Sequence, residues 1–64
     1  MVKSSKIKQA REKLRLSQEK LARLAGVSNN TIINIEEGKH QNPTIETLKK
    51  IAKALNVPIE ELIK

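Results

Sequence analysis

The chain has 64 residues, of which 38% are hydrophobic, and no cysteine, so it can form only one small domain without disulfides or thiolate metal sites. Its net charge of +6 lies in the first 24 residues, where eight Lys or Arg stand against two Glu. This asymmetry favours a polyanionic partner, although a solvated helix face would carry the same charges.

Apolar spacing and a capping residue predict the first two helices. In the first segment, apolar residues recur at i, i+3 and i+7, at Ile7, Ala10 and Leu14, which is typical of an amphipathic helix. Ser17 then offers a hydroxyl that can accept an unpaired backbone N–H. The helix that follows it, QEKLARLA, stops at Gly26.

The third helix begins almost at once, because only Val27 separates Gly26 from Ser28, which is another N-cap candidate. Two short helices joined this tightly cannot lie antiparallel. Residues three or four apart share a helix face, so an inward and an outward side can be assigned. The inward side carries Ile32, Ile35 and Glu36, and the outward side carries Asn29, Asn30, Ile33 and Asn34.

The outward side of the third helix is uncharged, in a chain that is 31% charged. Short amides beside one aliphatic residue match the chemistry of the DNA major groove. There, Asn can pair bidentately with adenine, and an aliphatic side chain can touch a thymine methyl. A solvated polar face is the alternative for the asparagines. For Ile33, packing against the following loop is an equally open alternative.

A fourth helix is expected from Thr44. Its apolar side comprises Ile45, Leu48, Ile51, Ala52 and Leu55. Asn56 can end it in the left-handed conformation, and Pro58 suits the first turn of a last short helix. That helix has the apolar residues Ile59, Leu62 and Ile63. Because no strand pattern is present, we expect an all-α, compact five-helix domain over residues 1–64, with residues 1–4 flexible.

The second and third helices belong to a longer pattern. It reads LSQEKLARLAGVSNNTIINIEEG and then NPTIETLKKIAKALNVPIEELI. From about Ile7 to Ile63 it resembles the helix-turn-helix domain of the lambdoid phage repressor and Cro family, also called the XRE family. The residues that match at the family's spacing are Gln18, Ala22, Gly26, Ile32 and Glu36. The resemblance implies a lambda-repressor-like fold with a helix-turn-helix unit over residues 17–36. In that fold the second helix lies across the DNA backbone and the third enters the major groove.

The resemblance also implies roles for single residues. Gln18 occupies a position at which the family binds a phosphate, although an ordinary helix-starting polar residue is the alternative. Lys39 opens a loop, up to Asn42, that the family places along the sugar-phosphate backbone. The asparagines stand where phage repressors read bases with glutamines, so the shorter side chain requires a closer approach or water bridges. The expected DNA-binding set is Gln18, Ser28, Asn29, Asn30, Ile33, Asn34 and Lys39.

Arg11 and Glu36 are expected to form a structural ion pair. Glu36 shares the inward side with Ile32, and burying a carboxylate without a partner is costly. Arg11 lies on the core-facing side of the first helix, and the resembling repressors have an Arg–Glu pair at these positions. A bidentate bridge would join the first helix to the end of the third. Direct phosphate binding by Arg11 is the alternative.

Three residues depart from the family pattern. Arg15 stands where relatives usually have glycine. Because a left-handed backbone there would cost about 1 kcal/mol, we expect the first helix to end differently. Glu37, at a position that is often basic or neutral, would repel a nearby phosphate. Thr44 replaces the arginine that some relatives insert into the minor groove.

Catalysis, metal binding and membrane insertion find little support. The chain has no aspartate, cysteine or tyrosine, and its one histidine, His40, has no partner residues that would make an acid–base or metal site. No apolar run resembles a signal peptide or a membrane span. We expect a soluble, cytoplasmic protein that is not an enzyme and needs no cofactor or small-molecule ligand.

These patterns together predict sequence-specific binding to double-stranded DNA by a transcriptional repressor that occupies a palindromic operator as a homodimer. The resemblance suggests a self-contact near Ile45, Val57 and Pro58, although Ile45 and Val57 could equally be core residues. A protein-interaction module on the same scaffold, antitoxin-like or coactivator-like, is the alternative. A nonspecific architectural protein, bound only through Lys and Arg, is a further one.

Overall fold

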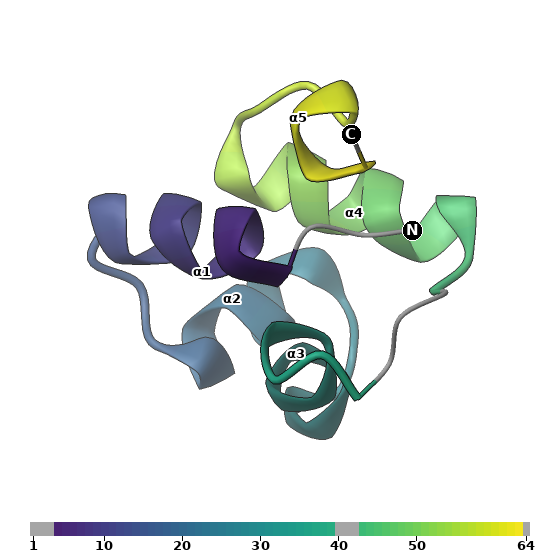
Figure 1. Ribbon diagram of the computed structural model, residues 1–64. Coiled ribbons are helices and arrows are strands. Elements are labelled where there is room, and N and C mark those ends of the chain that lie inside the picture. The colour runs from purple at the N-terminus through teal and green to yellow at the C-terminus, as the bar shows by residue number, and fades with distance from the viewer. Residues whose placement is uncertain (1–3, 40–42, 64) are drawn as a thin grey trace.

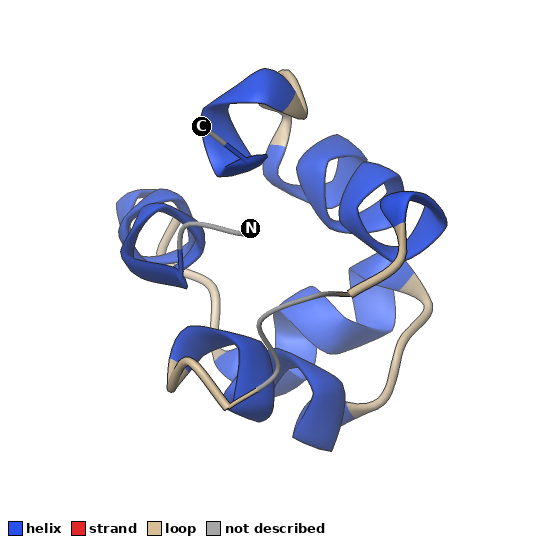
Figure 2. Cartoon of the chain, turned by 45° about the vertical axis from the view of Figure 1, so that its right-hand side comes forward, coloured by secondary structure: helices blue, strands red, loops and turns tan. Residues whose placement is uncertain are grey.

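The computed structural model describes residues 4–39 and 43–63, in which every regular element is a helix (Figure 2). The helices are α1 (Ser4–Lys13), α2 (Gln18–Ala25), α3 (Asn29–Glu36), α4 (Ile45–Leu55) and α5 (Glu60–Ile63). The prediction of an all-α domain with five helices is confirmed. The segment 1–4, expected from the sequence to be flexible, contributes Ser4 to α1. None of the helices in the described residues is long and apolar enough to cross a membrane.

The core consists of aliphatic side chains from all five helices. Its members are Ile7, Leu21, Ala22, Ala25, Ile32, Ile35, Leu48, Ile51, Ala52, Leu55 and Leu62. The chain has no aromatic residue, so aliphatic side chains must fill the interior. Removing one large aliphatic side chain from water contributes about 1.5–3 kcal/mol, which makes this cluster the main source of stability.

Helices α2 and α3 lie together at one end of the molecule, and α5 lies at the other end (Figure 1). Helix α2 contacts both α3 and α4, and α1 contacts α3 and α5. The connection from α2 to α3 turns at Gly26, whose φ is 72°. The Val27 N–H donates to the Ala22 carbonyl at 3.0 Å, which closes α2 immediately before α3 begins.

A hydroxyl caps the first turn of three helices. Ser17, Ser28 and Thr44 accept the backbone N–H of Lys20, Thr31 and Thr47 at 3.0, 3.1 and 3.1 Å. Each hydroxyl thereby satisfies a donor that has no partner inside its helix. The capping roles predicted for Ser17 and Ser28 are confirmed, and Thr44 precedes the fourth helix as its cap.

The end of α1 differs from the expectation. Arg15 has a φ of 59°, so it adopts the left-handed conformation despite its side chain. Its N–H donates to the Glu12 carbonyl at 3.0 Å, and the Leu16 N–H donates to the Arg11 carbonyl at 3.1 Å. These two bonds satisfy carbonyls at the end of the helix and hold the unfavourable backbone in place. The prediction that α1 ends without a left-handed residue is therefore wrong.

Two apolar residues expected on the inner faces are exposed. Leu14 is 47% exposed, because α1 ends at Lys13 and Leu14 already lies in the turn. Ile45, the first residue of α4, is 55% exposed, although Leu48 one turn later is buried. The expected burial of Ile45 in the core is therefore wrong, whereas the other four residues predicted for that face are buried.

Candidate nucleic-acid interface

One side of helix α3 packs into the core, and the opposite side is exposed to solvent. Ile32 and Ile35 are both 0% exposed, whereas Asn29, Asn30 and Asn34, which we call the asparagine face, are exposed. Ile33 is half-buried at the edge of that face. Among the described residues, no side-chain hydrogen bond uses an amide of the asparagine face. These amides therefore keep their donors and acceptors for water or for a ligand.

Ser28 fixes the start of α3. Its hydroxyl accepts the Thr31 N–H at 3.1 Å and also lies 2.7 Å from the Thr31 hydroxyl. The remaining N–H groups of the first turn point out of the helix, where they favour an anion. The structure thus gives Ser28 a capping role at the end of α3 from which the asparagine face begins.

Arg11 and Glu36 come together as a bidentate ion pair. Arg11 Nε donates to Glu36 Oε2 at 2.7 Å, and Nη2 donates to Oε1 at 3.1 Å. The Glu36 side chain is only 2% exposed and that of Arg11 only 11%. Arg11 Nη1 donates to the Leu16 carbonyl at 2.7 Å, so each guanidinium nitrogen is engaged within the domain. This geometry supports the expected structural role of Arg11 over the alternative, direct phosphate binding.

Gln18 also contacts the Glu36 carboxylate, and the sequence did not predict this contact. Gln18 Nε2 donates to Glu36 Oε1 at 3.0 Å, so the carboxylate accepts three hydrogen bonds from α1 and α2. We call Arg11, Gln18 and Glu36 the Glu36 cluster. It joins the start of α2 to the end of α3 and so fixes the two helices relative to each other. The sequence did contain a signal for this contact, because a carboxylate on the inward side of α3 needs more than one hydrogen-bond donor.

Lys39 follows α3 and is paired with a neighbour. Its ammonium lies 3.1 Å from Glu37 Oε1, and the two side chains are 70% and 51% exposed. An ion pair this exposed contributes about 0–1 kcal/mol, so Lys39 can exchange Glu37 for another anion at little cost. His40, Gln41 and Asn42, the rest of the expected backbone-following loop, lie outside the described residues.

The residues suggested for self-contact do not form one patch. Ile45 opens α4, whereas Val57 and Pro58 follow its end. At 1.5 Å per residue, the helix separates the two groups by roughly 18 Å. Ile45 and Pro58 are exposed and Val57 is half-buried.

In the described part of the chain, no group of His, Asp and Glu side chains is arranged to hold a metal ion.

These features define a class of protein. Helix α2, the sharp turn at Gly26 and helix α3 follow one another directly, and α3 presents polar side chains outward. This arrangement is that of a helix-turn-helix DNA-binding domain. The chain belongs to the helix-turn-helix family, whose model matches residues 7–62. It is an XRE-type domain, and its class is that of DNA-binding transcriptional regulators.

The comparisons with individual proteins agree with this class. The chain is 45% identical over 60 residues to the cryptic phage CTXphi transcriptional repressor RstR of Vibrio cholerae. That match covers 94% of this chain and 53% of the repressor, so the chain spans about half of the repressor's length. The restriction-modification controller protein C.AhdI of Aeromonas hydrophila has a similar structure, with a TM-score of 0.85 and 29% identity over 91% of this chain and 86% of that one.

The same fold also occurs within a longer enzyme. Hydroxypropylphosphonic acid epoxidase from S. wedmorenis matches 95% of this chain with a TM-score of 0.84 and 28% identity. The match covers only 32% of the epoxidase chain. The likeness therefore concerns one helical part of that enzyme and leaves the assignment to a regulator class unchanged.

Proposed function

We propose that the chain binds a palindromic duplex operator as a homodimer and represses transcription by occupying it. The observation that carries the proposal is the asparagine face, which is uncharged and exposed, and whose side-chain amides form no hydrogen bond within the described residues. The repressor name of the Vibrio relative supports a negative effect on transcription.

The asparagine face is proposed to read bases. A carboxamide can donate to N7 and accept from N6–H₂ of adenine at the same time through two separate atoms, whereas an ammonium can only donate. Asn29, Asn30 and Asn34 are short, so α3 must lie deep in the major groove or use bridging waters. Ile33, half-buried beside them, would contact a thymine methyl.

Gln18, Ser28 and Lys39 are proposed to bind phosphates. Gln18 Nε2 carries two N–H groups, and only one of them is used by Glu36, so the second can donate to a phosphate. Ser28 lies at the N-terminus of α3, where the helix dipole favours an anion. Lys39 can leave Glu37 for a phosphate, because their ion pair is exposed.

Two copies are needed for useful affinity. A single module of this kind buries only about 600–1,000 Å² on DNA. A dimer placed on two half-sites about one helical turn apart doubles the contacts and matches the two-fold symmetry of a palindrome. The self-contact is proposed near Ile45, Val57 and Pro58, which requires a partner surface that extends along α4.

Selection from random duplexes, followed by affinity measurements at several salt concentrations, tests the function. A recovered palindrome is expected, with a steep loss of affinity as salt increases. Asn29→Ala and Asn34→Ala should each cost about 1–3 kcal/mol of binding and relax the preference at one base position. Gln9→Ala, at an exposed residue of α1, serves as the matched control and should change neither quantity.

Other results would contradict the proposal. If both alanine variants keep the affinity and preference of the unmodified chain, the asparagine face does not read bases. A protein-interaction module then becomes the better interpretation. An equal affinity and salt dependence on every duplex would instead indicate an architectural protein. For Ile33, replacing thymine by uracil in the selected site should weaken binding, and no change would exclude the methyl contact.

A further inference from the structure

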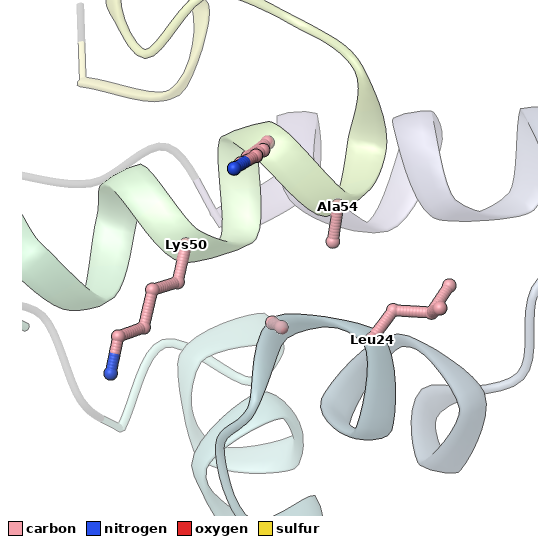
Figure 3. A pocket seen from close by; sticks show the side chains of 5 residues that line it. Leu24, Lys50 and Ala54 are labelled. Carbon is pink, nitrogen blue, oxygen red and sulfur yellow. The ribbon is translucent and has the colours of Figure 1, made fainter.

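A groove between α2 and α4 lies outside the residues proposed for DNA binding. The residues that line it are Leu24, Ala25, Lys50, Lys53 and Ala54. Its volume is about 410 Å³, within the roughly 300–1,000 Å³ typical of binding pockets. Figure 3 shows Leu24 on α2 and Ala54 on α4 bordering the same gap, with Lys50 extending from α4 beside it.

The wall of this groove is apolar and incompletely covered. Leu24 is 53% exposed, although the next residue, Ala25, belongs to the core. Ala54 is half-buried on the opposite helix. Single exposed leucines are common on protein surfaces, but this one borders a hollow that another side chain can enter. An apolar side chain seated there would remove both Leu24 and Ala54 from water.

Two ammonium groups flank the apolar wall. Lys50 and Lys53 are exposed, and their three-residue spacing places them on one face of α4. Within the described residues, neither lysine forms an ion pair, and Glu46, one turn before Lys50, lies beyond ion-pair distance. The groove therefore combines an apolar contact surface with two cations that have no carboxylate partner in this part of the chain.

We propose that this groove binds an acidic, amphipathic segment of a partner protein. An apolar side chain of the segment would lie between Leu24 and Ala54, and its carboxylates would pair with Lys50 and Lys53. A small-molecule site buries most of its ligand, whereas this groove leaves Leu24 and both lysines open to solvent. A peptide laid across α2 and α4 can cover such a surface with one anchor and a charged rim. The inference goes beyond DNA binding and does not rest on it.

Selection of a random library of short linear peptides on the immobilised chain tests the proposal. The enriched peptides should combine an aromatic or aliphatic residue with several acidic residues. When such a peptide is titrated into the isotope-labelled chain, the amide resonances of Leu24, Lys53 and Ala54 should shift. This mapping uses the unmodified chain, so it does not depend on how any variant folds.

Two variants test the two kinds of contact. Lys50→Glu/Lys53→Glu should weaken binding of the selected peptide by roughly tenfold or more, because attraction becomes repulsion. Leu24→Ser removes the apolar contact and should have a similar effect. The matched control, Lys8→Glu/Lys49→Glu, makes the same charge change at exposed lysines that do not line the groove. It should leave peptide affinity within about twofold.

Three results would overturn the proposal. The first is enrichment of peptides that lack acidic residues, and the second is a set of shifted resonances away from the groove. The third is displacement of the peptide by double-stranded DNA at physiological salt, which would assign the lysines to phosphate binding. The peptide is selected and its binding site is mapped without DNA. Peptide binding at the groove would therefore be observed even if the asparagine face does not read bases.

Discussion

The Glu36 carboxylate is the most deeply placed charge among the described residues. Its side chain is 2% exposed and accepts hydrogen bonds from Arg11 Nε, Arg11 Nη2 and Gln18 Nε2. A carboxylate removed from water loses its hydration, and only well-oriented donors offset that loss. The cluster joins α1, α2 and α3, so it positions the helix that carries the asparagine face. Its role is therefore in geometry as well as in stability.

Removal of one member of the Arg11–Glu36 pair should cost more than removal of both. Arg11→Met leaves Glu36 buried beside a single neutral donor and should lower the free energy of unfolding by about 3 kcal/mol. In Arg11→Met/Glu36→Met no unpaired charge remains, so the double variant should be more stable than the sum of the single effects predicts. Urea denaturation of the three variants measures the coupling.

The exposed pair Glu19–Arg23 provides the control for that cycle. Its side chains are 75% and 72% exposed, and the two charged atoms are 3.9 Å apart. The same substitutions there should couple by less than about 0.5 kcal/mol. Strict additivity at Arg11 and Glu36 would mean that the bidentate geometry contributes nothing to folding.

The backbone at Arg15 stores strain that glycine would relieve. An L-residue in the left-handed region costs roughly 1–2 kcal/mol, part of which is offset because glycine gains more freedom in the unfolded chain. Arg15→Gly should therefore raise the free energy of unfolding by up to about 1 kcal/mol, as measured by urea or thermal denaturation.

Gly26→Ala is the complementary change. Gly26 has a φ of 72°, and no atom lies within 4 Å of an added Cβ, so only the backbone conformation resists alanine. It should lower stability by about 1 kcal/mol. If Arg15→Gly is destabilising while Gly26→Ala behaves as expected, the Arg15 side chain must make a stabilising interaction that outweighs its strain.

At the scale of the helix, Ser28 has two roles that can be separated. It caps α3 through the Thr31 N–H, and it is also proposed to lie against a phosphate. Ser28→Ala should lower stability by about 1 kcal/mol. Ser28→Asp keeps an accepting oxygen and should retain stability within about 0.5 kcal/mol, but its carboxylate should weaken operator binding by repelling the phosphate.

Thr44 allows a matched comparison, because it caps α4 in the same way, through the Thr47 N–H at 3.1 Å. Thr44→Ala should reproduce the stability loss of Ser28→Ala and leave operator affinity unchanged, because it introduces no charge near the DNA. Denaturation and DNA titration on the same samples measure both effects. Equal operator affinity for Ser28→Asp and the unmodified chain would exclude a phosphate at Ser28.

Local signals predicted most of the helical architecture, because caps and apolar spacing depend on nearby residues. Ser17 and Ser28 cap the starts of α2 and α3, and Asn56 ends α4 in the left-handed conformation. The two sides of α3 follow from helical spacing. The exposure of Ile45 could not be predicted in this way, since it depends on whether another element covers the start of α4. The Gln18–Glu36 hydrogen bond likewise depends on how α2 and α3 meet.

The two ends of the molecule are formed by different helices. Helices α2 and α3 carry the proposed DNA surface at one end, and α5 lies at the other (Figure 1). In a single copy Ile45 is 55% exposed, and the α2–α4 groove is open to solvent. A two-fold operator needs a second copy whose recognition helix is one turn of DNA away. Ile45, at the start of α4, is the exposed apolar residue proposed for that self-contact.

Ile45→Ser tests the self-contact without disturbing the core. Ile45 is 55% exposed, so its removal should change stability by less than about 0.5 kcal/mol. Operator affinity should decrease by roughly tenfold or more on the full palindrome and remain unchanged on a single half-site, since only the cooperative term is lost. Leu14→Ser is the matched control, because Leu14 is 47% exposed and lies outside the proposed contact, and it should leave both affinities unchanged. An equal loss for Ile45→Ser on the palindrome and the half-site would mean that Ile45 acts on DNA binding within one copy and not between copies.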